Sequence, residues 1–203
     1  QGWQGRADVI SNFPPDKKVP SELIGSSSQD GAQSGKNVLS YGRFVGSKGF
    51  DTLIMAMPFA PEAHLTLVGD GPQMQELQNL AISLGVMDRV TFIGWKSDLT
   101  RYFASADIMV MPSRDEPLGN VILEAWAAGL PVIATRSQGP LWYGVDGVNM
   151  DLVDIDDAPA MGRAIARMGA DPARRARLAA EGRKTLAARF SKEAVIEQYL
   201  ALF

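Results

Sequence analysis

Two glutamates and two nearby cations are the residues of this chain best suited to chemistry. Glu116 and Glu124 lie eight positions apart, the first in a polar stretch and the second in an apolar, helix-like segment. Such a pair fits either a glycosidase, with one acid and one nucleophile or base, or two carboxylates that accept hydrogen bonds from hydroxyl groups. Arg43 and Lys48 could neutralise a diphosphate and stabilise it as a leaving group. Taken one at a time, each residue is also explained as an ordinary surface charge. Their positions in the fold therefore decide between a functional role and a surface charge.

The segments around these residues alternate between strand and helix patterns. Five short apolar runs predict buried strands, at residues 37–42, 64–70, 89–94, 108–113 and 131–135. Segments between them predict helices, at residues 49–57, 72–85, 97–106 and 120–128. Runs that are apolar on both faces are typical of parallel strands covered by helices. We therefore expect an α/β fold, a doubly wound Rossmann-like parallel sheet with flanking helices.

Local signals refine the predicted helices. Pro72 fits the first turn of a helix that Gly85 ends, and Ser97 fits the N-cap of the next one. Later segments predict a turn with a short strand and then three helices, at residues 143–153, 156–170, 171–190 and 191–203. Asp156 or Asp157 is expected to cap the first of these helices and Ser191 the last. Trp126 is expected in the core.

Composition excludes several classes of function. The chain has 203 residues, of which 46% are apolar and 21% charged, as in ordinary globular domains. A net charge of −3 gives no electrostatic reason to expect nucleic acid as a partner. The absence of cysteine excludes thiol chemistry, and no stretch has transmembrane length. Because the chain starts at Gln1 rather than Met, we expect it to be part of a longer protein.

Glycines and polar residues follow the carboxyl end of each of the five predicted strands. This edge is where open α/β sheets bind ligands, and the helix beginning near Gly119–Asn120 opens there. Free N–H groups at such a helix start favour phosphate. The residues after the five strands are, in order, Gly42, Arg43 and Lys48; Gly69–Pro72; Gly94–Lys96; Ser113–Glu116 and Gly119–Asn120; and Arg136–Gly139. This convergence favours a diphosphate role for Arg43 and Lys48 over the surface-charge alternative.

Four segments together resemble the family-4 (group 1) retaining glycosyltransferases. PSRDEPLGNVILEAWAAGLPVIAT resembles their signature of two glutamates separated by seven residues, and GRFVGSKGFDTLI resembles their phosphate loop. LVGDGP resembles the end of the next strand in the family. DGVNMDLV resembles a later segment of the family, with the pattern DG-x-N-G-x-LV. The similarity runs in order from about Ala7 to Phe203, which a single motif cannot do. The chain is thus similar to the C-terminal, nucleotide-sugar-binding half of the two-domain GT-B fold.

The resemblance implies a role for each matching residue. Arg43 and Lys48 would hold the diphosphate, Glu116 would bind the hydroxyls of the donor sugar, and Glu124 would bind the ribose. Glu116, Arg43 and Lys48 would be the catalytic set. The residues implied to contact the nucleotide sugar are Gly42, Arg43, Lys48, Gly71, Gly94, Trp95, Lys96, Ser113, Glu116, Leu118, Gly119, Asn120, Val121 and Glu124. The resemblance also implies that neither a metal nor another cofactor is needed, and that the departing diphosphate helps to deprotonate the acceptor on the same face.

The implied function is that of the donor-binding domain of a retaining glycosyltransferase. It would move a sugar from a UDP- or GDP-sugar to an acceptor glycan or lipid, such as lipopolysaccharide or another envelope glycan, held by a missing N-terminal domain. The isolated domain would bind nucleotide without turnover. The full-length enzyme would be cytoplasmic, with peripheral association at the inner face of the membrane. Two alternatives stay open, namely a GT-B nucleotide-sugar epimerase and a non-catalytic nucleotide-binding module.

The expected organisation has three parts. Residues 1–36 would form an interdomain strand, within residues 7–16, followed by a flexible loop. Residues 37–190 would form the Rossmann-like domain, and residues 191–203 a helix that packs back toward the missing domain. The basic residues of the preceding helix are expected to form a solvated face rather than a lipid-binding one, namely Arg174, Arg175, Arg177, Arg183, Lys184 and Arg189.

Some positions depart from the family pattern. Pro117-Leu118-Gly119 replaces a Gly-Phe-Gly-like run, the usual glutamate is replaced around Trp142, and Met150 stands in place of a glycine. These changes leave the identity of the donor open. Residues 154–156 spell Asp-Ile-Asp, the metal motif of another glycosyltransferase fold, but their place ahead of a helix favours helix capping over Mg²⁺ binding.

Overall fold

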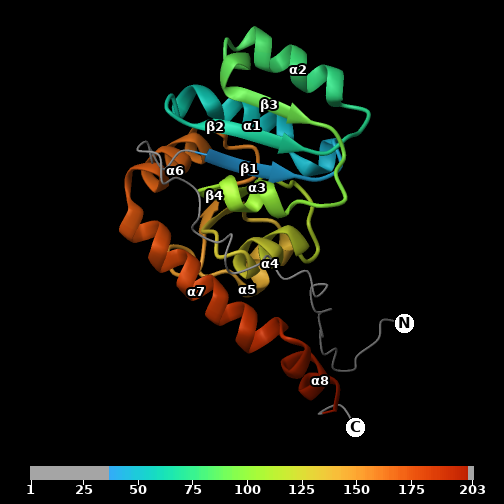
Figure 1. Cartoon of the computed structure of the whole chain (residues 1–203), viewed down its shortest axis with the longest axis vertical. Coiled ribbons are helices and arrows are strands. Elements are labelled where there is room, and N and C mark those ends of the chain that lie inside the picture. The colour runs from blue at the N-terminus through green and yellow to red at the C-terminus, as the bar shows by residue number, and fades with distance from the viewer. Residues whose placement is uncertain (1–36, 201–203) are drawn as a thin grey trace, which may run out of the picture.

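Six parallel strands form one sheet in the computed structural model, which describes residues 37–200. Figure 1 shows this part of the chain in colour. The strands are β1 (Asn37–Tyr41), β2 (His64–Val68), β3 (Val90–Ile93), β4 (Ile108–Met111), β5 (Val132–Thr135) and β6 (Asp151–Val153). Their order in space is β3-β2-β1-β4-β5-β6, and every neighbouring pair is parallel. The predicted α/β class and doubly wound sheet are confirmed. The strand expected within residues 7–16 and the loop after it lie outside the described residues.

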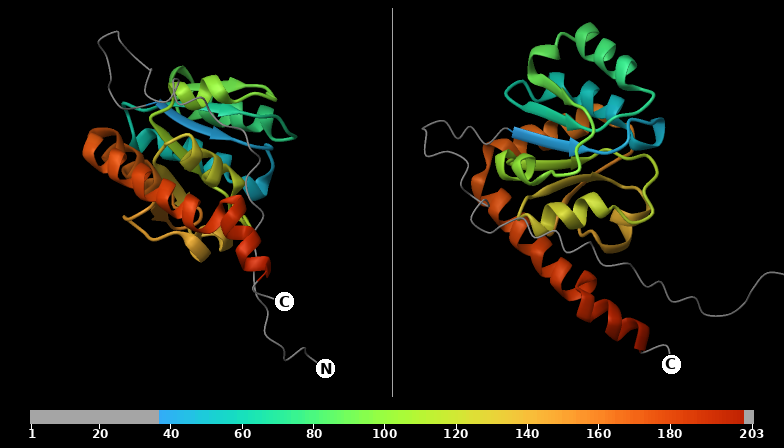
Figure 2. Two further views of the ribbon diagram at one scale, coloured as in Figure 1. Left: turned by 60° about the horizontal axis from the view of Figure 1, so that its bottom comes forward. Right: turned by 45° about the vertical axis from the view of Figure 1, so that its right-hand side comes forward.

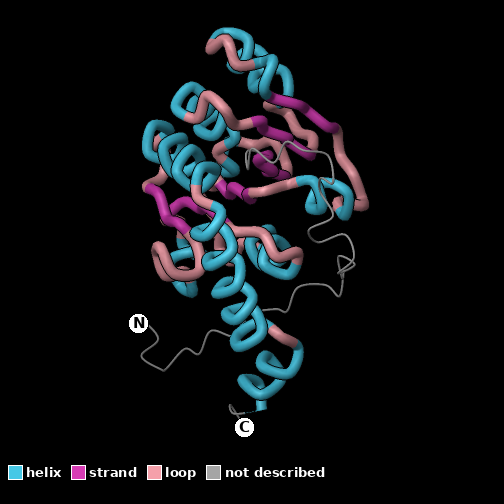
Figure 3. The backbone as a smooth tube through the Cα atoms, turned by 60° about the vertical axis from the view of Figure 1, so that its left-hand side comes forward, coloured by secondary structure: helices cyan, strands magenta, loops and turns pink. Residues whose placement is uncertain are grey.

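Helices cover both faces of this sheet (Figure 3). They are α1 (Phe50–Ala56), α2 (Met74–Ser83), α3 (Thr100–Ser105), α4 (Asn120–Ala127), α5 (Gln138–Tyr143), α6 (Ala158–Ala170), α7 (Pro172–Phe190) and α8 (Lys192–Leu200), with short 3-10 turns at Gly46–Lys48, Met57–Phe59 and Met87–Arg89. Helices α1, α2 and α6 share one buried apolar cluster, and α3, α4 and α5 share the other. Helix α7 runs diagonally past the sheet and leads into α8, which projects beyond it (Figure 2).

The middle of the sheet is the most deeply buried part of the described chain. All four residues of β4 and all four of β5 are buried, which explains why their sequences are apolar on both faces. Trp126 on α4 is fully buried, as predicted, and packs edge-on against Tyr143 of α5. A rigid central sheet of this kind holds the loops at its edges in fixed positions.

The order of the strands determines where these loops meet. The chain winds in one direction through β1, β2 and β3, and in the other direction through β4, β5 and β6. The reversal lies between β1 and β4, which are direct neighbours with Val38 opposite Ile108. Open α/β sheets bind ligands at this switch point, outside the carboxyl ends of the strands. The loops that follow Tyr41 and Met111 therefore lie beside each other.

The structure corrects two local expectations and confirms two others. Helix α3 begins at Thr100, and Asp98 rather than Ser97 accepts the Thr100 N–H, at 2.9 Å. Helix α5 was not predicted, because its glycine and proline suggested a turn; its burial comes from the packing of Tyr143 against Trp126 and Phe190. At the other predicted caps, Asp157 accepts the Ala160 N–H, and Ser191 accepts the Ala194 N–H.

The basic face of α7 is less solvated than we expected. Arg174 forms an ion pair with Asp151, whose side chain is 2% exposed. Arg175 donates hydrogen bonds to the main-chain oxygens of Met168 and Gly169, at 2.9 and 2.6 Å. These arginines stabilise the end of α6 and the start of β6, so the prediction of a solvated face is wrong for them.

Among residues 37–200, no helix is both long enough and apolar enough to cross a membrane.

Candidate functional site

The loops after β1 and β4 are joined directly to each other. The N–H groups of Arg114 and Asp115 both donate to the main-chain oxygen of Ser47, at 2.8 and 3.3 Å. Gly49 has φ +64°, and a Cβ at this position would collide with the main-chain oxygen of Pro112. Only glycine allows the two loops to approach this closely at that point. The contact brings the predicted cation loop against the loop that carries the first glutamate.

Lys48 and Glu116 form an ion pair at this contact. The Lys48 Nζ lies 2.6 Å from Glu116 Oε2, and the two side chains are 32% and 15% exposed. The other carboxylate oxygen of Glu116 accepts the Gly119 N–H at 3.1 Å. The structure therefore places the predicted sugar-binding carboxylate beside a predicted diphosphate cation. Both of its oxygens are held as hydrogen-bond acceptors.

Helix α4 starts at this pair. Gly119 is its N-cap and adopts φ +86°, which favours glycine. The Leu118 main-chain oxygen accepts the Tyr143 hydroxyl at 2.7 Å, which fixes the turn from α5. N–H groups in the first turn of a helix have no preceding carbonyl to bind, so the start of α4, at Asn120 and Val121, is suited to binding an anion.

Glu124 lies one helical turn further on and has a different partner. The Tyr41 hydroxyl, at the end of β1, donates to Glu124 Oε2 at 2.7 Å. Burial, and secondarily the Glu124 charge, raise the pKa of Tyr41 well above its usual value, so this phenol remains a donor. Because Tyr41 also packs edge-on against Phe103 at 5.7 Å, the carboxylate of Glu124 is held from a rigid support.

A cleft of about 760 Å³ opens beside Glu124. Trp95, which is 71% exposed, and Lys96 form part of one wall after β3. The remaining residues around the cleft are Tyr41, Gly42, Arg43, Val68, Gly69, Asp70, Ser97, Leu99 and Glu124. Of these, Gly42, Arg43, Gly69 and Asp70 were predicted from the strand ends, and Glu124 from the pair of glutamates. A concave surface with an exposed aromatic ring and a carboxylate can accommodate the base and ribose of a nucleotide.

The predicted residues thus fall into two adjoining groups. Arg43 lines the cleft with Glu124 and Trp95, whereas Lys48 lies with Glu116 at the start of α4. One predicted contact residue, Ser113, lies deeper than the rim. It is 2% exposed, and its main-chain oxygen accepts the Thr135 hydroxyl, so a supporting position under the ligand surface fits the structure better than direct contact. Gly71 is half-buried and packs against the main chain of Phe44, and its contact with the ligand stays a prediction.

Reasoning from the sequence gave no role to three residues that support this rim. Tyr41 and Tyr143 hold Glu124 and the α4 turn, and Arg114 joins the two loops. Tyr41 directly precedes Gly42-Arg43, and Arg114 lies two positions before Glu116. Their closeness to the motif residues could therefore have identified both from the sequence. No comparable signal pointed to Tyr143, which reaches the rim from the unpredicted helix α5.

The Asp-Ile-Asp motif takes part in ion pairs. Asp154 lies 3.3 Å from Arg136, and Asp156 lies 2.7 Å from Arg114. Within the part of the chain that the structure describes, no group of three or more His, Cys, Asp or Glu side chains is arranged to hold a metal ion.

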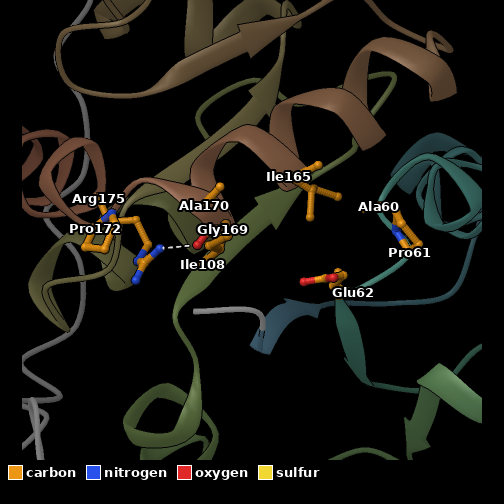
Figure 4. A pocket seen from close by; sticks show the side chains of 11 residues that line it. Ala60, Pro61, Glu62, Ile108, Ile165, Gly169, Ala170, Pro172 and Arg175 are labelled. Atoms are coloured by element: carbon orange, nitrogen blue, oxygen red, sulfur yellow. Dashed lines mark hydrogen bonds between the residues drawn. The ribbon is translucent and has the colours of Figure 1, made fainter. Parts of the chain in front are cut away.

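A second hollow, of about 520 Å³, lies at the opposite end of the strands (Figure 4). Its walls are largely apolar, formed by Ile108 at the start of β4, Ile165 of α6 and the segment around Ala60. Arg175 points toward Gly169 at one side of it. None of the residues predicted from the strand ends lines this hollow, so the candidate site is confined to the carboxyl ends.

Comparisons with known proteins agree with this geometry. Residues 27–185 match the family described as glycosyl transferases group 1. The lipopolysaccharide core biosynthesis glycosyltransferases LpsE and LpsD of Rhizobium meliloti are 46% and 39% identical over 99% and 100% of the chain, which covers 58% of each. The crystal structure of Anabaena Alr3699/HepE in complex with UDP and glucose superposes with a TM-score of 0.79 at 27% identity, over 90% of this chain and 52% of that one.

The chain therefore spans between half and three fifths of the length of these proteins. The match extends through the sheet, the cation loop and both glutamates. The resemblance inferred from the sequence is confirmed. This chain belongs to the group 1 glycosyl transferases and has the Rossmann-like fold of one half of a GT-B enzyme.

Proposed function

We propose that this chain is the donor-binding domain of a retaining glycosyltransferase that uses a UDP- or GDP-sugar. One observation carries the proposal, namely that Glu116 pairs with Lys48 just before the start of α4, while Glu124 lies one turn further along the same helix. Carboxylates suit hydroxyl groups, whereas a cation and free N–H groups suit a diphosphate. A sugar, a diphosphate and a ribose follow one another in that order in a nucleotide sugar.

Each part of the donor has a matching part of the rim. The base would lie beside Gly94, Trp95 and Lys96, and the ribose hydroxyls would bind Glu124 above Val121. The diphosphate would lie between Arg43, Lys48 and the first N–H groups of α4. The donor sugar would bind Glu116.

The proposed reaction breaks the bond between the anomeric carbon and the diphosphate oxygen. The electron pair of that bond leaves with the diphosphate, and the acceptor oxygen forms a new bond on the same face of the sugar. The acceptor proton passes to an oxygen of the departing diphosphate. Arg43 and Lys48 would stabilise the negative charge that develops on this leaving group, as a metal ion does in other enzymes. Glu116 would orient the sugar for this step.

The names of two relatives support a proposal for the acceptor. The names of LpsE and LpsD assign them to lipopolysaccharide core biosynthesis, so a core oligosaccharide or another envelope glycan is the proposed acceptor. Such a glycan would be held by the other half of the GT-B enzyme, and the helix α8 would pack toward that half. The full-length enzyme would then work in the cytoplasm at the inner face of the membrane.

Calorimetry with UDP, GDP and NAD tests the proposal. Binding of UDP or GDP together with no binding of NAD is expected from a nucleotide-sugar site. Failure to bind either UDP or GDP would refute it. A nucleotide-sugar epimerase is distinguished by incubating the intact protein with the donor alone, because epimerisation needs no acceptor. A non-catalytic module would bind nucleotide but transfer no labelled sugar when the intact protein also receives core oligosaccharide.

A further inference from the structure

Arg114 uses its whole guanidinium group to join two loops of the site. The group has five N–H donors, and five hydrogen bonds between 2.6 and 3.2 Å match them. The acceptors are the main-chain oxygen of Gly46, both carboxylate oxygens of Asp51, the Thr52 hydroxyl and Asp156 Oδ1. No N–H of this guanidinium remains for a phosphate, so its function lies in the loops that it connects.

The main chain of Arg114 strengthens the same connection. Its N–H donates to the Ser47 oxygen at 2.8 Å, directly before Lys48. Its side chain reaches Gly46 on the same turn, at 2.6 Å. Glu116 lies two residues after Arg114 and binds Lys48 at 2.6 Å. Arg114 is thus bonded to the turn that carries Lys48 while belonging to the loop that carries Glu116.

The acidic partners of Arg114 are themselves held in place. Asp156 has φ +62° and is the single non-glycine residue with positive φ in the described part of the chain. Its carboxylate also accepts the Thr52 hydroxyl at 2.9 Å. The hydrogen bonds and charge of Arg114 outweigh the burial of Asp51 and lower the pKa of that carboxyl group. A residue with positive φ, such as Asp156, persists only where the surrounding contacts hold it in that conformation. The contacts around Arg114 therefore form a well-ordered network.

We infer that Arg114 is a positioning residue that fixes the diphosphate cation Lys48 relative to the sugar-binding carboxylate Glu116. This inference rests on the proposed function. Without the guanidinium, the turn at residues 46–48 keeps its hydrogen bonds to the neighbouring main chain but loses its side-chain anchor. Lys48 then samples positions away from the diphosphate, while the base and ribose contacts around Trp95 and Glu124 are unaffected.

The test compares nucleotide with nucleoside binding in the intact protein. Calorimetry is carried out with UDP and uridine and with GDP and guanosine, and the pair that the wild type binds is used. Arg114→Met should weaken nucleotide binding roughly tenfold or more, the scale of one hydrogen bond to a charged group, and nucleoside binding less than about twofold. Arg114→Lys keeps the charge but not the five-bond geometry, so it should show a smaller loss in the same direction.

Arg174→Met is the matched control. Arg174 is 21% exposed against 29% for Arg114 and also pairs with an aspartate, but it lies on α7, and its partner Asp151 is the first residue of β6. It should lower the melting temperature and leave the ratio of nucleotide to nucleoside affinity unchanged. The positioning role would be overturned if Arg114→Lys, and any Arg114→Met protein that folds, kept the wild-type ratio of nucleotide to nucleoside affinity. It would also be overturned if Arg174→Met changed this ratio as much as the Arg114 variants do. If the wild type binds neither UDP nor GDP, the proposed function itself fails.

Discussion

Lys48→Ala should weaken nucleotide binding by roughly 10- to 100-fold. A hydrogen bond to a charged group contributes about 1.5–3 kcal/mol, and each 1.4 kcal/mol is about tenfold in affinity. The structure adds a second effect, because Lys48 lies 2.6 Å from the mostly buried Glu116. Removing the ammonium group leaves that carboxylate uncompensated and facing the diphosphate. In the wild type, however, the diphosphate must share Lys48 with Glu116, so the contact between Lys48 and the diphosphate is weakened. This favours the lower half of the expected range of roughly 10- to 100-fold.

The two effects can be separated with a second substitution. Lys48→Ala combined with Glu116→Gln removes the uncompensated charge, so it should recover part of the nucleotide affinity lost in Lys48→Ala. Lys184→Ala is the control, since Lys184 is exposed and pairs with Glu181 on α7. Calorimetry with nucleotide and nucleoside is the assay. Equal losses for both ligands in Lys48→Ala would contradict the diphosphate role, and a double variant weaker than the single one would contradict the charge argument.

Further predictions concern the supports of the site and the stability of the fold. Glu124→Ala and Tyr41→Phe should each lower affinity for the ribonucleotide more than for its 2′,3′-dideoxy analogue, and the effect of Tyr41→Phe should be the smaller. If calorimetry finds equal losses for the two ligands, Glu124 does not bind the ribose. Gly49→Ala should lower the melting temperature more than Gly85→Ala, because both have φ near +65° but only Gly49 has a main-chain oxygen in the way of a Cβ. Burial, then the Glu116 charge, raises the pKa of Tyr143, so its stabilising contribution is present below pH about 10 and is lost as pH rises further. Urea unfolding should therefore show a shallower loss of stability above that pH in Tyr143→Phe than in the wild type.

The fold was predictable because its signals are local. Runs such as residues 108–111 are apolar on both faces, which requires cover on both sides of a sheet. Strand and helix patterns that alternate along the chain then leave a parallel sheet as the compact solution. Helix α5 escaped prediction because its stability is not local. Its six residues include Gly139 and Pro140, and aromatic contacts of Tyr143 with Trp126 and Phe190 bury it.

The partners of the site residues were harder to predict than the residues themselves. Glu116, Glu124, Arg43 and Lys48 are identified by type, spacing and place at strand ends. Their partners lie far away in sequence, since Tyr41 and Glu124 are 83 positions apart and Lys48 and Glu116 are 68 apart. Pairings over such distances depend on the order of the strands, which a single sequence leaves open. Both pairs join the loop or strand end after β1 to the segment after β4, and β1 and β4 are direct neighbours in the sheet.

These partners bear on the choice between cleaving and holding a sugar. A glycosidase needs one of its two carboxyl groups to donate a proton to the leaving oxygen. Here Glu116 receives hydrogen bonds from Lys48 and the Gly119 N–H, and Glu124 receives one from Tyr41. Groups that donate to both side chains favour two acceptors over an acid and a base. Each glutamate then has oxygen lone pairs left for hydroxyl groups, which is the arrangement that binding a donor at its sugar and at its ribose requires.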